Sequence, residues 1–417
     1  MSLIARFICL AWFFAGLTFA ISVGMPGGYN IGGALIFLSS IGLIFIKPKW
    51  ALLNKQDRLL FWTFFSFAIS MFIAVAMDSM SIRELDKPSR FLVVLPVLVL
   101  LLNVTNRKEW LWYSVLFGAI FAFSMALHER VVLGDRRSGV GINEIMFGNT
   151  AMLLGLLSFA GAIYFYSQKR YAWMWLSIIG GFAGIGGSVL SGTRGGWVGL
   201  PFIGLFLFWQ CRDLLGRKLL LSVFSVVILS LVTVVAVPQT GVQKRVNDAV
   251  SDITKYLDGS RRATSVGVRF DLWKSSVLIV KQAPIFGVGA SQITPLRKEL
   301  AADNLISKAS SRFGHAHNEY FDALAKRGIV GLVFLLMVYL VPLKLFLNKL
   351  KEHKTDWRIR SYAIAGALIP MGYIDFSLTQ GMLSHNIGVV MYAFPVVYFW
   401  AALRWAEREA LEEEPMV

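Results

Sequence analysis

Long apolar runs separated by short polar loops make up most of the chain. A window of about 19 residues, the length of a membrane-spanning helix, identifies twelve such runs. The predicted spans cover residues 3–23, 31–46, 59–77, 91–104, 110–127, 144–166, 171–190, 195–210, 219–237, 328–347, 362–380 and 384–403. We read the first as a retained anchor, because it lacks a clear signal-peptide cleavage site and further spans follow. The pattern predicts an all-α polytopic membrane protein.

One polar insertion, at about residues 238–327, separates the ninth and tenth predicted spans. Its first apolar residues recur at helical spacing with charges between them, which predicts an amphipathic helix that lies on the membrane or caps the bundle. These apolar residues are Val242, Val246, Val250, Ile253 and Leu257. A second helix is expected from Arg269, with an apolar stripe of Phe270, Trp273, Val277 and Val280. A turn at 284–289 and a third helix at about 294–309 are expected to follow.

The insertion divides the chain into four parts. Residues 1–237 hold spans one to nine, 238–327 form the polar helical insertion, 328–403 hold the last three spans, and 404–417 form a tail. The even-numbered connections hold 17 Lys and Arg residues, whereas the short odd-numbered ones hold seven. Because cytoplasmic loops carry the excess of basic residues, we expect both termini in the cytoplasm and the insertion outside.

Composition supports this class of protein and excludes others. Of the 417 residues, 56% are hydrophobic and 16% are charged, with a mean hydropathy of +0.62. Soluble domains are about a quarter charged. The net charge of +16 follows mostly from the cytoplasmic loops, and no basic-aromatic module accompanies it, so we expect no nucleic-acid partner.

The sequence predicts no cofactor or metal. Its two cysteines, Cys9 and Cys211, form no disulfide framework, and its five histidines match no common zinc-binding pattern. We also find no phosphate-binding glycine loop, so neither ATP nor a dinucleotide is expected.

The end of the insertion carries the strongest candidate for chemistry. His317 is followed by Asn318, a good helix N-cap, and eleven residues after His317 a glycine, Gly328, opens a long apolar run. A neutral imidazole accepts a proton near neutral pH, and a helix N-terminus both keeps it neutral and attracts anions. A lone histidine more often only caps a helix, but the surrounding pattern favours a catalytic role.

Two arginines are the candidate partners of His317. Arg194 lies in a tight external turn with small neighbours, and Arg269 is placed at a predicted helix start, where a cation is locally unfavourable. Two guanidinium groups near a bilayer surface suit a lipid pyrophosphate. The alternatives are that Arg194 only snorkels to the interface, and that the neighbouring Arg136 and Arg137 are plain solvated surface rather than substrate ligands.

These residues resemble the bacterial O-antigen ligases. The segment His317-Asn318-x9-Gly328-x-x-Gly331 is similar to the histidine signature of that family. The segment from Arg269 to Gly289 and the turn 193–197 are also similar to the superfamily, which includes O-antigen polymerases and protein O-oligosaccharyltransferases. Twelve spans with one large periplasmic loop between the ninth and tenth match the ligases over nearly the whole chain. The resemblance implies a GT-C-like fold in the bacterial inner membrane, with its active site on the periplasmic side.

The resemblance also implies substrates and roles. The donor would be a polysaccharide on undecaprenyl pyrophosphate, and the acceptor a sugar hydroxyl of lipid A-core in lipopolysaccharide biosynthesis. His317 would be the general base, whereas Arg269 and Arg194 would bind the pyrophosphate. Such a transfer is metal-independent and inverts the anomeric centre, since retention would need a nucleophilic carboxylate.

Further polar residues are candidates for substrate binding. His315 lies two residues from His317 but does not fit the signature spacing, and His385 faces the same side with a role in acceptor binding expected. Asp375 is an ionisable group inside a predicted span and resembles an aspartate late in the ligase family, with an arginine as its expected partner. Asp271 and Glu319 are expected to be helix-start carboxylates.

Three other functions compete with the ligase. An O-antigen polymerase would share the donor but need two pyrophosphate sites. A protein O-oligosaccharyltransferase usually carries an extra C-terminal region, and we expect none after Leu403. A lipid-linked glycan transporter would line a path through the membrane midplane with polar groups, whereas the candidate groups here gather at one external face.

Overall fold

A computed structural model describes residues 10–413, apart from 47, 105–106, 194, 217, 219–220, 222–224, 226–241 and 261. Within these residues the chain forms α-helices, short 3-10 helices and turns, and no strand. This confirms the predicted all-α class for the part of the chain that the structure describes. The predicted ninth span, 219–237, lies almost entirely outside the described residues, so it stays a prediction.

The helices follow the apolar runs closely. Those before the insertion are α2 (Ala11–Ala20), α3 (Gly28–Ile41), α4 (Leu43–Ile46), η1 (Trp50–Leu52), α5 (Lys55–Met77), η2 (Ile82–Leu85), α6 (Asp86–Asn103), α7 (Trp110–Val131), α8 (Glu144–Ser167), α9 (Tyr171–Leu190), η3 (Gly195–Trp197) and α10 (Leu200–Cys211). The insertion holds α12 (Val242–Leu257), α13 (Ser265–Val280), α14 (Ile293–Ala302) and η5 (Ser310–Arg312). The last part holds α15 (Glu319–Glu352), α16 (Trp357–Phe376), η6 (Met382–Ser384) and α17 (Asn386–Glu413).

Seven helices of the described residues are long and apolar enough to cross a membrane. They are α3 with α4, α5, α7, α8, α9, α15 and α17, and the shorter apolar helices are α2 and the segment 195–211. Helices α6 and α16 coincide with predicted spans but carry charges near their ends, such as Asp86 and Arg90 in α6 and Arg358 in α16. The chain is therefore a multi-pass membrane protein, whereas the total of twelve spans stays a prediction.

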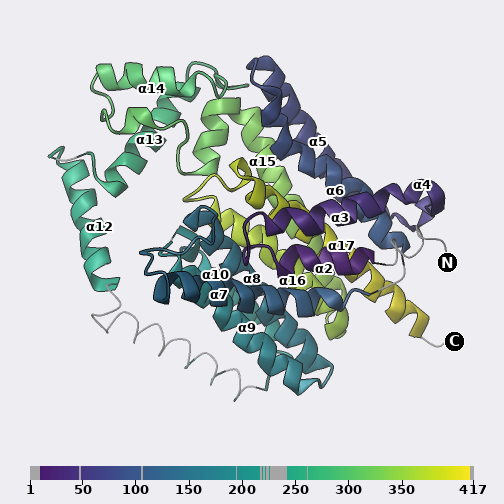
Figure 1. The fold of residues 1–417 in the computed structure, drawn as a ribbon. Helices are drawn as coiled ribbons and strands as arrows, with labels where there is room; N and C mark the ends of the chain where they lie inside the picture. Colours follow the sequence, from purple (N-terminus) through teal and green to yellow (C-terminus); the bar gives the residue numbers. More distant parts are fainter. Residues whose placement is uncertain are drawn as a thin grey trace.

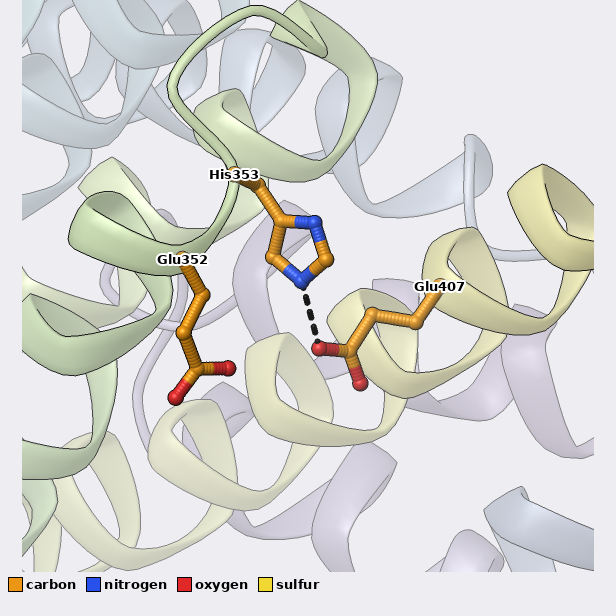
Figure 2. Close-up of side chains that lie close together, drawn as sticks. All are labelled: Glu352, His353 and Glu407. Carbon is orange, nitrogen blue, oxygen red and sulfur yellow. Dashed lines mark hydrogen bonds and ion pairs between the residues drawn. The ribbon is translucent and has the colours of Figure 1, made fainter.

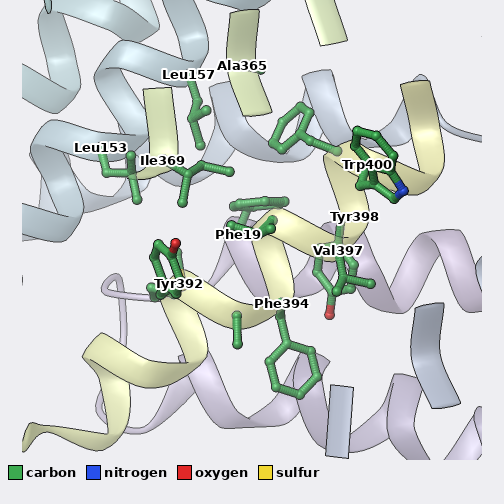
Figure 3. Packing of buried hydrophobic residues seen from close by; sticks show 14 of the residues in the cluster. Phe19, Leu153, Leu157, Ala365, Ile369, Tyr392, Phe394, Val397, Tyr398 and Trp400 are labelled. Atoms are coloured by element: carbon green, nitrogen blue, oxygen red, sulfur yellow. The ribbon is translucent and has the colours of Figure 1, made fainter. Parts of the chain in front are cut away.

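The centre of the bundle is built from α8, α16 and α17, which are buried along most of their lengths. Helix α16 packs against α8, α15 and α17, and α17 also packs against α6. Figure 3 shows part of this core, with side chains of α17 lying against Phe19 of α2, Leu153 and Leu157 of α8 and Ile369 of α16. Since these helices run from one end of the bundle to the other, the loops at their ends gather in two groups.

The insertion lies at one side of the bundle, where α13 contacts the start of α15 (Figure 1). Helix α12 has the predicted bounds, and the predicted turn at 284–289 separates α13 from α14. Helix α13 begins four residues earlier than expected, at Ser265 with Thr264 as its N-cap, and α14 ends earlier, at Ala302. The start of α2 and the end of α17 lie on the opposite side of the bundle from α13 and α14 (Figure 1).

The apolar stripe predicted for α13 is only partly buried: Phe270, Trp273 and Val280 are half-buried, and Val277 points outward. Val277 is 42% exposed, and the buried face instead carries Leu272, Ser275, Ser276 and Ile279. Two serines face inward because their hydroxyl oxygens accept hydrogen bonds from a buried arginine of α14, described below. Hydrophobic periodicity cannot identify a helix face that is buried against a polar group.

Candidate functional site

His317 lies directly before Asn318, the N-cap of α15, on a strained backbone. Its φ is +47°, in the left-handed region that residues with a side chain seldom adopt. Asn318 caps the helix, since its side-chain oxygen accepts hydrogen bonds from the backbone N–H groups of Tyr320 and Phe321 at 3.0 and 3.1 Å. Strain of this kind persists only where the surroundings hold it and is frequent at functional sites.

The loop that presents His317 is held by a fully buried arginine, Arg297 of α14. Its guanidinium donates to the carbonyl oxygens of Phe313 at 2.7 Å and His315 at 3.1 Å, and to the hydroxyls of Ser275 and Ser276 at 3.0 and 3.4 Å. A buried arginine needs such partners for its donors, because burying an unpaired charge is costly. Arg297 therefore joins α13, α14 and the histidine loop.

Two further contacts fix the loop from the other side. Asp322 accepts a hydrogen bond from the backbone N–H of Ala316 at 3.0 Å and pairs with Lys326 at 2.6 Å. The Trp273 indole donates to the carbonyl oxygen of Ala316 at 3.2 Å, and its ring stacks on Phe321 at 5.6 Å between centroids. Helices α13 and α15 thus both hydrogen-bond to the backbone of Ala316, the residue that precedes His317.

The rings of His315 and His317 lie side by side, 4.1 Å apart between centroids. Both are half-buried, and Phe313 contacts both. Burial lowers the pKa of His317 below its usual range, and the positive charges of Arg269 and Arg297 lower it further, against opposing effects of Gln380 and Asp322. Burial, aided by the His317 neighbour, lowers the pKa of His315 to about 4. Both imidazoles are therefore neutral at neutral pH.

The positive charge of Arg269 acts on His317, where it lowers the pKa of the imidazole. Arg269 is half-buried in the second turn of α13, and burial lowers its own pKa. No carboxylate of the described residues pairs with its guanidinium. The expectation that Arg269 starts a helix is wrong, because α13 begins at Ser265. The helix dipole therefore gives no reason to regard Arg269 as functional. Its half-buried, unpaired charge, acting on a neutral histidine, is instead the sign of an anion site.

The signature glycine Gly328 interrupts α15. Its backbone has φ +61° and ψ −160°, and a Cβ there would lie 2.3 Å from the carbonyl oxygen of Ile285. The break lets the segment 284–289 pair with the residues on both sides of Gly328. The backbone N–H of Val288 donates to Ala325 at 3.2 Å, and the N–H of Ile329 donates to Pro284 at 2.9 Å. The two family-like segments, 284–289 and the glycine signature, are therefore one structural unit. It fixes the insertion to the membrane helix.

Glu319 ties the start of α15 to the segment between α16 and α17. It is the first residue of α15, as predicted, but it is buried, and its carboxylate accepts four hydrogen bonds at 2.9–3.0 Å. Their donors are Tyr339, Ser377 and the backbone N–H groups of Met382 and Leu383. In addition, the Asn318 amide donates to the carbonyl oxygen of Leu378 at 3.0 Å. The segment 377–385 therefore packs against the start of α15, directly after the histidine.

The same segment brings His385 to this end of the bundle, together with a residue that the sequence did not indicate. Gln380 is buried, and its amide nitrogen lies 3.2 Å from Nε2 of His385. Burial lowers the pKa of His385, as does the charge of Lys87. Nothing in the spacing around Gln380 or Arg297 marks either residue, because each acts through contacts between segments distant in sequence.

Arg194 lies outside the described residues, so its part in the site stays a prediction, whereas residues 195–199 are described. A Cβ at Gly195 would lie 2.0 Å from Oγ1 of Thr379, and the backbone N–H of Gly199 donates to Asp375 at 2.6 Å. The turn 191–199 therefore packs against the segment that carries Gln380. The described partner of Asp375 is this backbone N–H and not the arginine that was expected.

Arg137 and Arg136 differ in their surroundings. Arg137 donates from Nε to the carbonyl oxygen of Ser191 at 3.0 Å, so it contacts the turn that contains position 194. Arg136 is exposed, and its carbonyl oxygen accepts a hydrogen bond from Arg130. Substrate binding by either remains a prediction.

Asp271 is not at a helix start, in contrast to the prediction. It is the seventh residue of α13, is fully buried, and accepts hydrogen bonds from Tyr256, the Ser307 backbone and Ser310 at 2.7–3.1 Å. It therefore joins α12 and the 307–310 turn to α13.

One group of side chains has the composition of a metal site. Figure 2 shows Glu352, His353 and Glu407, with His353 hydrogen-bonded to Glu407 at 2.8 Å. The ammonium group of Lys349 lies 2.6 Å from Glu352 and 2.8 Å from Glu407, and Arg404 also pairs with Glu407. Because these cations already neutralise the carboxylates, we interpret the group as an ion-pair network. It lies at the ends of α15 and α17 that are remote from His317.

A cavity of about 400 Å³ opens at that same remote end. Its lining includes Trp110, Tyr164 and Arg358, and none of the candidate site residues. These residues begin α7 and α16 and end α8, whereas the candidate site lies where α16 ends and α8 begins. The cavity is therefore separate from the histidine.

Comparison with known proteins agrees with this placement. Residues 179–336 match a family model described as O-antigen ligase. An uncharacterized protein of Haemophilus influenzae is 30% identical over 377 residues, which cover 90% of this chain and 94% of that protein. An O-antigen ligase of Escherichia coli K12 is 21% identical over 245 residues, 58% of this chain and 57% of that protein.

The matched segment runs from α9 through the turn 191–199 and the insertion into α15. It therefore contains His317, Arg269 and both signature glycines. The chain belongs to one family with the Haemophilus influenzae protein, and within it the segment around His317 resembles the O-antigen ligases.

Proposed function

We propose that this protein is an O-antigen ligase, a glycosyltransferase that moves an O-polysaccharide from undecaprenyl pyrophosphate to a sugar hydroxyl of lipid A-core. The observation that carries the proposal is a half-buried His317 whose pKa is lowered by burial and by the charge of Arg269, inside the segment that matches the ligase family. Among the described residues, no carboxylate pairs with the Arg269 guanidinium. A base beside an anion-binding cation is what transfer from a sugar pyrophosphate requires.

The proposed reaction is a single displacement. The acceptor hydroxyl oxygen attacks the anomeric carbon while its proton passes to His317. The bond from that carbon to the pyrophosphate oxygen breaks, and its electron pair stays on undecaprenyl pyrophosphate. Arg269, with Arg194, binds the pyrophosphate and stabilises the charge that develops on it. His317 then releases its proton to water.

The chemistry explains why few residues are needed. Pyrophosphate is a good leaving group, so neither a general acid nor a metal ion is required, and charge stabilisation supplies the larger share of the acceleration. Attack opposite the leaving group inverts the anomeric centre. Arg136, Arg137, His315, Asn318, Asp375 and His385 are proposed to line or support the substrate sites.

The membrane arrangement is part of the proposal. The chain would lie in the bacterial inner membrane with twelve spans and a GT-C-like fold, both termini in the cytoplasm, and the insertion 238–327 in the periplasm as the part that carries the catalytic site. The gathering of His317, Arg269 and His385 at one end of the bundle favours a catalyst over a transporter, whose polar groups would line a path through the membrane.

Two enzymes with the same donor are the alternatives. A polymerase would bind a second pyrophosphate-linked glycan as acceptor, and a protein O-oligosaccharyltransferase would use a Ser or Thr hydroxyl. Of the two described arginines that act on His317, Arg297 is occupied by the carbonyl oxygens of Phe313 and His315, which leaves Arg269 for one pyrophosphate and favours the ligase over the polymerase.

The test is transfer of undecaprenyl-pyrophosphate-linked glycan to purified lipid A-core by the isolated protein, with a chelator and no nucleotide. Wild type is expected to be active and His317→Ala inactive, whereas His128→Ala, which changes an exposed histidine of α7, should match the wild type. Growth of polymer, or glycosylation of a supplied peptide, without transfer to lipid A-core would replace the proposed acceptor. An active His317→Ala variant would refute the role of the histidine.

A further inference from the structure

The buried side chain of Gln380 has an oxygen without a partner. Gln380 is 4% exposed, and its amide nitrogen faces His385 at 3.2 Å. Its Oε1 is buried and accepts no hydrogen bond from the described residues. Buried amide oxygens are nearly always paired in folded proteins, so an unpaired one needs an explanation.

His317 offers the complementary atom. Its Nδ1 is also buried and without a hydrogen-bond partner in the described part of the chain. The segments that carry His317 and Gln380 are hydrogen-bonded to each other at neighbouring positions. The Glu319 N–H donates to the carbonyl oxygen of Ser377 at 2.8 Å, and the Asn318 amide donates to that of Leu378 at 3.0 Å. Gln380 also raises the pKa of His317 against the effect of burial, as an acceptor beside the ring would.

We propose that Gln380 is a positioning residue for the general base, whose Oε1 accepts the Nδ1–H of His317 and so leaves the Nε2 lone pair free for the acceptor hydroxyl. The inference rests on the proposed function, because only a base needs a fixed tautomer. The partner of one imidazole nitrogen decides which nitrogen carries the proton, and therefore which can accept one.

His385 fixes the orientation of the Gln380 amide. Its Nε2 accepts from the amide nitrogen, which turns the amide oxygen away from His385. Because burial and Lys87 lower the pKa of His385, its ring remains neutral and can act as this acceptor. On the other side of His317, the ring of His315 packs at 4.1 Å and limits rotation of the imidazole.

The experiment compares Gln380→Leu, which removes the acceptor, with Gln380→Glu, which keeps an acceptor and adds a charge. Gln292→Leu is the matched control, since Gln292 is exposed directly before α14. The readouts are kcat, the KM of each substrate and the pH dependence of kcat/KM, measured with purified full-length protein, undecaprenyl-pyrophosphate-linked glycan and lipid A-core.

Gln380→Leu is expected to lower kcat by about 10–100-fold, as does removal of other groups that orient a histidine, with little change in either KM. Gln380→Glu should keep most of the activity at neutral pH. Its carboxylate stabilises the imidazolium, in addition to the effects of Arg269, Arg297, Asp322 and His315 around the ring, so the acid limb of the profile should move to higher pH. Gln292→Leu should match the wild type.

Wild-type kcat in Gln380→Leu, or an equal loss in both Gln380 variants with an unmoved acid limb, would overturn the inference. In both cases the proposed function would stand if wild type transfers glycan and His317→Ala does not. Failure of the wild type to transfer glycan to any of the three acceptors would instead refute the proposed function, and the inference with it. If Gln380→Leu does not fold, the shift of the acid limb in Gln380→Glu decides by itself.

Discussion

Replacing Gly328 with alanine should uncouple the insertion from the membrane helix. The backbone conformation, φ +61° and ψ −160°, is almost restricted to glycine and costs about 1–3 kcal/mol for another residue. The added Cβ would also lie 2.3 Å from the Ile285 carbonyl oxygen and 2.7 Å from the Gly287 nitrogen. These are backbone atoms, so relief requires the two segments to separate.

Separation breaks hydrogen bonds that the two segments share. Four of them, at 2.9–3.2 Å, join residues 284, 285, 288 and 289 to 325, 326, 329 and 330. If two are lost at about 1 kcal/mol each, the total destabilisation is about 3–5 kcal/mol together with the strain. Because His317 lies eleven residues before Gly328, on the same unit, we expect loss of transfer activity as well.

Thermal unfolding of the detergent-solubilised protein and the transfer assay together test this reasoning. Gly204→Ala is the matched control, because a Cβ at Gly204 meets no atom within 4 Å. Gly328→Ala should unfold at a clearly lower temperature than both wild type and Gly204→Ala. A Gly328→Ala protein with wild-type unfolding temperature and activity would refute the proposed role of the break.

Two further predictions follow from the surroundings of the histidine. Because the pKa of His317 is lowered, kcat/KM should stay constant as the pH falls from 8 through the ordinary histidine range near 6.5, and should decline only below it, when the base becomes protonated. His315→Gln, measured over the same range, should leave this acid limb in place. A decline of the wild type that begins above pH 7 would contradict the assignment. Arg297→Met leaves the carbonyl oxygens of Phe313 and His315 unpaired, which should destabilise the fold by about 1–3 kcal/mol each. The unfolding temperature should therefore fall, whereas Lys298→Met at the exposed neighbouring position should leave it unchanged.

The helices were predictable because the signals that define them are local. Apolar runs long enough to cross a bilayer marked most of the observed helices, and the spacing of Val242 to Leu257 predicted α12 with its observed bounds. Asn318 was recognisable as a cap because capping depends on the residues directly following it. The signature around His317 likewise depends only on spacing along the chain.

The misjudged details depend on tertiary contacts. The inward face of α13 is polar because Arg297 is buried against it, and Asp271 is buried because Tyr256 and Ser310 reach it from other segments. Among the described residues, the partner of Asp375 is the backbone N–H of Gly199 and not an arginine. None of these partners is near in sequence, so no periodicity could indicate them.

The sequence by itself determined that the chain is a helical membrane protein with one polar insertion, and that Asn318, directly after His317, caps the helix that follows the insertion. It did so because hydrophobicity, helix period and capping are properties of neighbouring residues. Only the tertiary structure decided which groups meet His317, since folding brings Arg269, Gln380 and the buried Arg297 to it from three separate segments. The burial that keeps the histidine neutral arises from that packing. The role of a polar residue such as Gln380 likewise depends on the residues that folding places next to it.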